Sequence, residues 1–135
     1  TKPFGMGCRG STGVLGLTGS APYIGDSFTL TLETRPATGL GVFHLGASKT
    51  MWNGQSLPFS LAAIGATGCF LLVSPDIFLP GTTRGTTSTL TISLPNNPSL
   101  IGQVVYAQGE ATDPQGGNAA GIVFANGVDI QIGAK

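Results

Sequence analysis

Carboxylates and a single histidine are the side chains of this 135-residue chain that could perform acid–base chemistry. A glycosidase needs two carboxyl groups that flank a sugar linkage. Turn formation accounts for three of the six acids, since Asp26, Asp76 and Asp113 lie beside Gly or Pro. His44 has no Ser, Cys or acid in a recognised catalytic motif, and the pattern Gly-x-Ser-x-Gly is absent. The sequence therefore predicts a protein that is not an enzyme, with no catalytic residue and no cofactor; the other carboxylates are Glu33, Glu110 and Asp129.

The two cysteines, Cys8 and Cys69, are the other reactive side chains. With His44 they cannot complete a four-ligand zinc site without carboxylate help, so no metal site is predicted. They are either two free thiols in the core or a disulfide. We favour the disulfide, because Cys8 lies in a Gly-rich stretch with no hydrophobic pattern of its own to bury it. Such a bond implies an oxidising compartment and predicts an extracellular or cell-surface location.

Exposed aromatic side chains could bind a polysaccharide. Trp52 is the single tryptophan and lies next to a predicted turn, and Tyr23 lies in a predicted loop. Many β-sandwich modules stack sugar rings on such aromatics, which makes glycan binding the alternative functional hypothesis. In the other interpretation, Trp52 covers the open end of the hydrophobic core.

The composition excludes several kinds of partner. Charged residues make up 9% of the chain and the net charge is zero, so there is no basic stripe for nucleic acid. No apolar run approaches the 18 or so residues of a membrane-spanning helix, so no membrane insertion is expected. Near-zero net charge also removes the repulsion that keeps proteins apart, which favours self-association.

The strands that would position these residues are clearest around Ser88–Thr112. In 88–94, apolar residues alternate with Thr and Ser, which predicts a strand with one buried face. The segment 104–109 has a partly apolar pattern on both faces, so both should be covered. Pro95 and Pro98 separate the two strands and cannot donate to a ladder, which predicts an arch between two sheets instead of a tight hairpin.

The rest of the chain is predicted to form further short strands with turns between them. Alternating or continuous apolar runs predict strands at 28–32, 40–45 and 57–61, and at 69–73 in the centre of a sheet. AsnGly pairs at 53–54 and 126–127 predict hairpin turns. With eight or nine short strands and almost no helix, we expect an all-β, antiparallel two-sheet β-sandwich, with a jelly roll as second choice. Residues 1–13 are expected to form a tail tethered by the disulfide, and residues 14–135 a single domain.

Several motifs resemble one known family. The stretches GlyCysPheLeuLeuValSerProAsp at 68–76 and LeuProAsnAsnProSerLeuIleGlyGlnValValTyrAlaGln at 94–108 are similar to a small β-sandwich module. That module occurs at the C-terminal end of large secreted and surface-exposed bacterial proteins. GlyCys at 7–8 and the TrpAsnGly to LeuPro stretch at 52–58 also match, as do AspPro at 113–114 and IleGly at 132–133. The resemblance implies a β-sandwich and an extracellular location, and it implies no catalytic activity.

These observations predict a secreted, non-enzymatic structural protein whose subunits associate with one another in an extracellular fibre or a cell-surface layer. Because 1–6 has no strand pattern, we expect a neighbouring subunit to hold it, through Pro3, Phe4 and Met6. Such a head-to-tail contact would generate a ring or an open filament.

Overall fold

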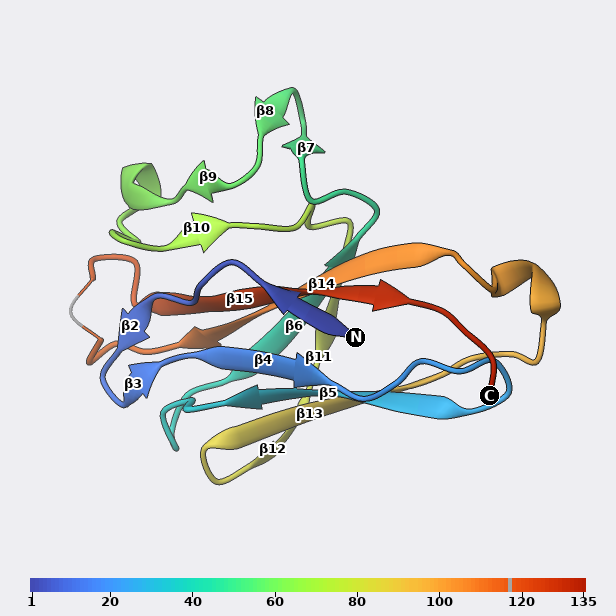
Figure 1. The fold of residues 1–135 in the computed structure, drawn as a ribbon. Helices are drawn as coiled ribbons and strands as arrows, with labels where there is room; N and C mark the ends of the chain where they lie inside the picture. Colours follow the sequence, from blue (N-terminus) through green and yellow to red (C-terminus); the bar gives the residue numbers. More distant parts are fainter. Residues whose placement is uncertain (117) are drawn as a thin grey trace.

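The computed structural model describes residues 1–116 and 118–135, and its two principal sheets are both antiparallel (Figure 1). The larger sheet has the strand order β1 (Lys2–Phe4), β15 (Ile122–Gln131), β14 (Val104–Thr112), β6 (Gly41–Gly46) and β11 (Ile77–Pro80). The smaller has the order β12 (Thr82–Arg84), β13 (Thr87–Ser93), β5 (Ser27–Glu33) and β4 (Gly16–Gly19). The predicted antiparallel β-sandwich with almost no helix is confirmed.

The remaining elements are short. Three pairs of two-residue strands are β2 (Arg9–Gly10) with β3 (Gly13–Val14), β7 (Met51–Trp52) with β8 (Gln55–Ser56), and β9 (Phe59–Ser60) with β10 (Phe70–Leu71). Two 3-10 turns are η1 (Ala62–Ile64) and η2 (Pro98–Leu100). The described part of the chain thus has more strands than the eight or nine predicted, because pieces of two or three residues carry no readable alternation.

The hydrophobic core lies between the two principal sheets. The alternation of β5 places Phe28, Leu30 and Leu32 on its inner face, where they are fully buried. Phe43 of β6 and Ile130 of β15 face them from the larger sheet and are equally buried. On β6 and β14, side chains of the opposite parity therefore point away from this core. On β15 a register shift against β14, between Gln108 and Glu110, exchanges the two faces, so that Val123 faces the core and Ile122 and Phe124 point away from it.

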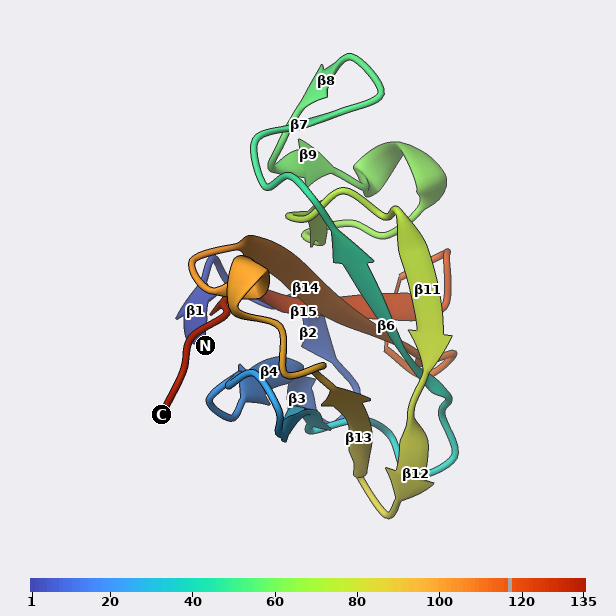
Figure 2. The ribbon, with the colours of Figure 1, turned by 90° about the vertical axis from the view of Figure 1, so that its right-hand side faces the viewer.

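The predicted arch is present. β13 ends at Ser93 in the smaller sheet, and β14 begins at Val104 in the larger one, with η2 in the connection (Figure 2). Asn97 begins η2 by accepting a hydrogen bond from the backbone N–H of Ser99 at 3.1 Å. Prolines that cannot donate to a ladder thus stop one sheet before the chain enters the other.

Residues 47–76, called the lobe below, leave the larger sheet after β6 and return to it at β11. In Figure 2 the lobe carries β7 to β9 and lies on the side of β14 and β15 opposite to β4 and β13. It begins with the predicted hairpin: Asn53 and Gly54 have φ of 50° and 77° between β7 and β8, as a type I′ turn requires. The larger sheet is therefore covered on both faces, as the pattern of β14 predicted.

Three predictions about local structure are wrong. AsnGly at 126–127 lies inside the continuous strand β15 and makes no turn. The apolar run 69–73 is not a central strand, since just Phe70 and Leu71 pair, with β9 in the lobe. Residues 1–13 are not an irregular tail throughout, because Lys2–Phe4 form β1 on the edge of the chain's own larger sheet, paired with β15.

Candidate functional site

A groove lies between the lobe and the outer face of the larger sheet. Strand register assembles its floor: Glu110 of β14 is opposite Val42 of β6 on one side and Phe124 of β15 on the other. His44 and Ile122 lie two residues along these strands and so share the same face. Strand alternation, together with the register shift between β14 and β15, thus brings residues far apart in the sequence to one surface.

The groove has a volume of about 500 Å³ and is lined almost entirely by apolar atoms. The lobe supplies one wall, which includes Trp52, Phe59 and Ile64, and β11 supplies Phe78. All four of these side chains are at least partly exposed, so the groove is open to solvent. The complete lining is Val42, His44, Trp52, Phe59, Leu61, Ile64, Leu71, Pro75, Phe78, Glu110, Ile122 and Phe124.

His44 and Glu110 form a buried polar pair in the floor of this groove. The Nδ1 atom of His44 lies 2.9 Å and 2.8 Å from the two carboxyl oxygens of Glu110. Its Nε2 atom lies 3.0 Å from the carbonyl oxygen of Val73, which can accept but not donate. Both ring nitrogens are therefore occupied, and neither is free to take a proton from a substrate.

Burial raises the pKa of Glu110 above its ordinary value of 4.5, and the hydrogen bond and the charge of His44 oppose that rise. The folded carboxyl group consequently holds its proton to a higher pH than the unfolded chain does. By linkage, its contribution to the free energy of unfolding is fully present below pH 4.5 and is lost as the pH rises through the folded pKa.

We therefore predict that Glu110→Gln removes a fall in stability that the parent protein shows as the pH rises above 4.5. The amide keeps the shape of the side chain and can donate to Nδ1 of a neutral His44. Urea unfolding at several pH values between 4 and 7 measures the effect. Glu33→Gln, which alters an exposed carboxylate, is the control and should keep the parent slope. A Glu110→Gln protein that loses stability as steeply as the parent would contradict the assignment.

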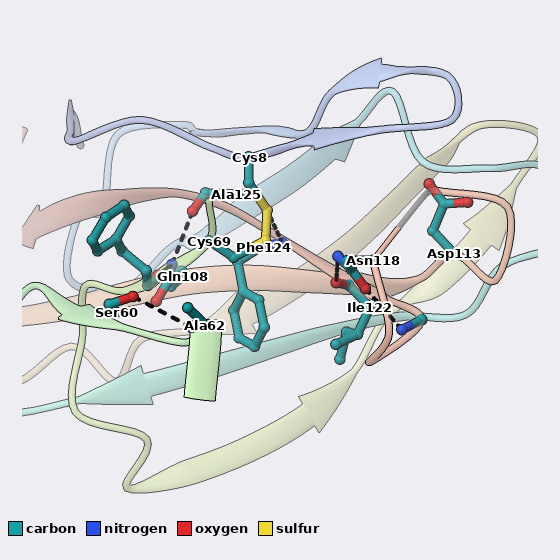
Figure 3. Close-up of a disulfide and its surroundings, with 12 residues drawn as sticks. Cys8, Ser60, Ala62, Cys69, Gln108, Asp113, Asn118, Ile122, Phe124 and Ala125 are labelled. Carbon is teal, nitrogen blue, oxygen red and sulfur yellow. Dashed lines mark hydrogen bonds between the residues drawn. A yellow bond between two sulfur atoms is a disulfide. The ribbon is translucent and has the colours of Figure 1, made fainter. Parts of the chain in front are cut away.

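The lobe is attached to the sheet by a disulfide and by one glutamine. Figure 3 shows the bond between Cys8, from the N-terminal segment, and Cys69, from the lobe, beside Phe124 and Ala125 of β15. The backbone N–H of Cys8 donates to the carbonyl oxygen of Phe124 at 2.9 Å. The predicted disulfide is confirmed, and it is typical of an oxidising environment.

Gln108 of β14 is fully buried, and its side chain binds the backbone of the apolar run 69–73 in the lobe. Its Oε1 accepts from the N–H of Leu72, and its Nε2 donates to the carbonyl oxygen of Phe70, both at 2.9 Å. Nε2 also donates to the carbonyl oxygen of Ala125 at 2.9 Å (Figure 3). Apart from the exposed Phe70, the run 69–73 is buried, and Gln108 satisfies two of its backbone groups that do not bond to β9 in the lobe.

The two aromatics predicted for glycan stacking are not brought together. Trp52 lines the groove and is 38% exposed. Tyr23 forms an isolated bridge with Gly133 near the C-terminus, and the ammonium of Lys135 lies 5.9 Å from its ring. Figures 1 and 2 show β7 and the C-terminus well apart in the molecule. Trp52 covers the outer groove, not the end of the core between the sheets.

The N-terminal residues predicted to contact a neighbouring subunit are partly engaged within the chain. Pro3 pairs with Val128 in the ladder, and Phe4 packs edge-on against Tyr106 at 6.4 Å between ring centroids. The ammonium of Lys49 lies 4.8 Å from the centre of the Phe4 ring. Met6 is highly exposed and Pro3 is exposed as well, so both side chains remain accessible to a partner, whereas Phe4 is half-buried within the chain.

Four of the five acids outside the groove have structural partners. Asp76 accepts hydrogen bonds from the N–H of Ala47 and the hydroxyl of Ser74, and Asp113 accepts from the N–H and hydroxyl of Ser11. Asp129 and Asp26 pair with Lys49 and Lys135, respectively. Across the described residues, no group of three or more His, Cys, Asp or Glu side chains could hold a metal ion, and no helix is long and apolar enough to cross a membrane.

Sequence reasoning did not bring His44 and Glu110 together. The two residues are 66 positions apart, and no motif links them. The alternation in β6 could have indicated the site, since Val42 and His44 lie on the face of the strand opposite to the buried Phe43. His44 thus lies on the outer face of β6. Because the pattern of the adjacent β14 predicts that both faces of the sheet are covered, a histidine there should be buried and should need a polar partner.

No protein-family model matches the sequence, and no similar protein was found among curated proteins. The resemblance to a module of secreted bacterial proteins therefore stays a prediction, and function must be argued from the residues themselves.

Proposed function

We propose that the protein is a secreted, non-enzymatic structural subunit that associates with other copies of itself in an extracellular fibre or cell-surface layer. One observation carries the proposal. The edge strand β11 presents two large apolar side chains to solvent, Ile77 at 53% and Phe78 at 60% exposure. An exposed apolar edge strand is a template for pairing with another chain.

The two edges of the larger sheet differ in this respect. β1, at the opposite edge, contains Lys2 and Pro3, and both a charge and a residue without an N–H discourage further pairing. β11 has its proline at its last residue, Pro80, and no charged residue within Ile77–Pro80. Of these two edges, β11 is the better suited to pair with a second copy.

Further observations support association outside the cell. Charged residues are 9% of the chain and the net charge is zero, so little repulsion opposes contact between copies. The disulfide fits an oxidising location. The occupied ring nitrogens of His44 favour a structural role over acid–base catalysis.

The symmetry of the contact constrains the assembly. Two copies of β11 that pair with each other make an isologous contact, which closes into a dimer. A fibre or layer needs a second contact elsewhere on the surface. Exposed Met6, which follows β1 at the other edge of the larger sheet, is the candidate for that second contact.

We predict that Ile77→Lys weakens self-association at least tenfold, because each copy would have to bury an ammonium group against its partner. Sedimentation velocity over a concentration series measures the change. Ile101→Lys is the matched control, since it adds the same charge at a similarly exposed apolar residue that follows η2, outside β11 and the segment that carries Met6, and it should associate as the parent does. If Ile77→Lys and the parent assemble over the same concentration range, β11 is not the contact.

A further inference from the structure

We propose that the groove between the lobe and the larger sheet is a binding site for a small, uncharged, apolar molecule. The inference does not depend on self-association, because the groove is complete within one copy of the chain. It starts from the shape and chemistry of the groove walls.

The size of the groove fits a small ligand. Its volume of about 500 Å³ lies within the range of roughly 300 to 1,000 Å³ that is usual for small-molecule sites. Aromatic rings from four separate segments surround the space: Trp52 and Phe59 in the lobe, Phe78 on β11 and Phe124 on β15. A flat or elongated hydrocarbon can contact several of these rings at once.

The polar groups of the groove exclude other kinds of ligand. The titratable side chains in its lining are His44 and Glu110, and each is hydrogen-bonded to the other. The second nitrogen of His44 is taken by the carbonyl oxygen of Val73. A sugar hydroxyl or a peptide N–H that entered the groove would lose water, and neither ring nitrogen of His44 is free to replace the lost hydrogen bond.

An apolar molecule has no such cost and gains from the exposed walls. Phe59, Ile64 and Phe78 are apolar side chains that water contacts in the unliganded protein. Covering them removes apolar surface from water, which is the main favourable term in binding a hydrocarbon. The chemistry of the groove thus points to an apolar small molecule, in preference to a glycan or an extended peptide.

The neutral dye N-phenyl-1-naphthylamine provides the test, at protein concentrations where the chain is monomeric. We expect one dye molecule to bind per chain, with quenching of Trp52, which is the single tryptophan and lines the groove. Phe59→Asp should weaken binding at least tenfold, because it puts a carboxylate in the wall. Ile64→Asp serves the same purpose if Phe59→Asp does not fold. Neither variant alters β11.

Ile101→Asp is the matched control. Ile101 is an exposed apolar residue that follows η2, outside the groove, and its variant should bind the dye as the parent does. Three results would overturn the proposal: no binding up to the solubility limit of the dye, equal weakening by Ile101→Asp, or retention of the protein on insoluble polysaccharide that Trp52→Ala abolishes. The last result would assign the groove to glycans.

Discussion

Replacing Cys8 and Cys69 together by alanine should lower the free energy of unfolding by about 4 kcal/mol. The bond joins residues 61 positions apart, so it removes a large loop-closure entropy from the unfolded chain. At roughly 3.5 °C per kcal/mol for a chain of this length, the midpoint of thermal unfolding should fall by about 14 °C. Differential scanning calorimetry measures the midpoint directly.

Reduction provides the control for the disulfide. A reducing agent should lower the unfolding midpoint of the parent protein and leave that of the double alanine variant unchanged, because the variant has no bond to reduce. A parent protein that unfolds at the same temperature with and without reductant would show that the bond contributes nothing to stability.

Replacing Arg35 by alanine should cost about 4 kcal/mol of stability, through loss of charge-assisted hydrogen bonds worth roughly 1.5 to 3 kcal/mol each. Arg35 is fully buried, and its partners are backbone carbonyl oxygens. Nη1 donates to Pro36 at 2.6 Å and to Gly39 at 2.5 Å, and Nη2 donates to Gly85 and to Thr87. The guanidinium thus ties the loop before β6 to the turn between β12 and β13.

Two further variants make this prediction falsifiable. Arg35→Lys keeps the charge but lacks the planar fork, so it should lie between the parent and the alanine variant. Arg9→Ala removes an exposed arginine and should change stability by less than about 0.5 kcal/mol. Urea unfolding midpoints measure all three. Equal midpoints for Arg35→Ala and Arg9→Ala would contradict the structural role of the buried guanidinium.

The fold class could be predicted because alternation and turn chemistry act locally. Three buried residues at spacing two in 28–32 specify an inner face, and prolines around 95–98 specify a crossing. Asn53 and Gly54 adopt the turn that their side chains favour, since they lie in an exposed hairpin where nothing else competes.

Tertiary contacts account for the predictions that were wrong. Asn126 stays extended because its side-chain amide accepts from the N–H of Leu17 at 2.8 Å and donates to the carbonyl oxygen of Leu17 at 3.0 Å, in the opposite sheet. A Cβ on Gly127 would lie 2.5 Å from the Phe4 ring, so this glycine makes room for β1. An AsnGly dipeptide therefore forms a hairpin turn at 53–54, whereas at 126–127 it stays in a strand and its two residues make packing contacts.

The groove could not be predicted from the sequence, because it is formed by contacts between segments that are far apart in the chain. The groove forms because the lobe packs over β6, β14 and β15. No sequence pattern within 47–76 predicts this packing. Nothing in the sequence around Arg35 marks a buried guanidinium. Strand register and side-chain-to-backbone bonds such as those of Gln108 decide these features, and both require the assembled sheet.

Electron microscopy of the concentrated parent protein tests the central claim, that this chain is a self-associating structural subunit. The account predicts ordered fibres or layers that Ile77→Lys abolishes or reduces strongly. Single particles of monomer size at every concentration, or assemblies that Ile77→Lys leaves unchanged, would contradict it.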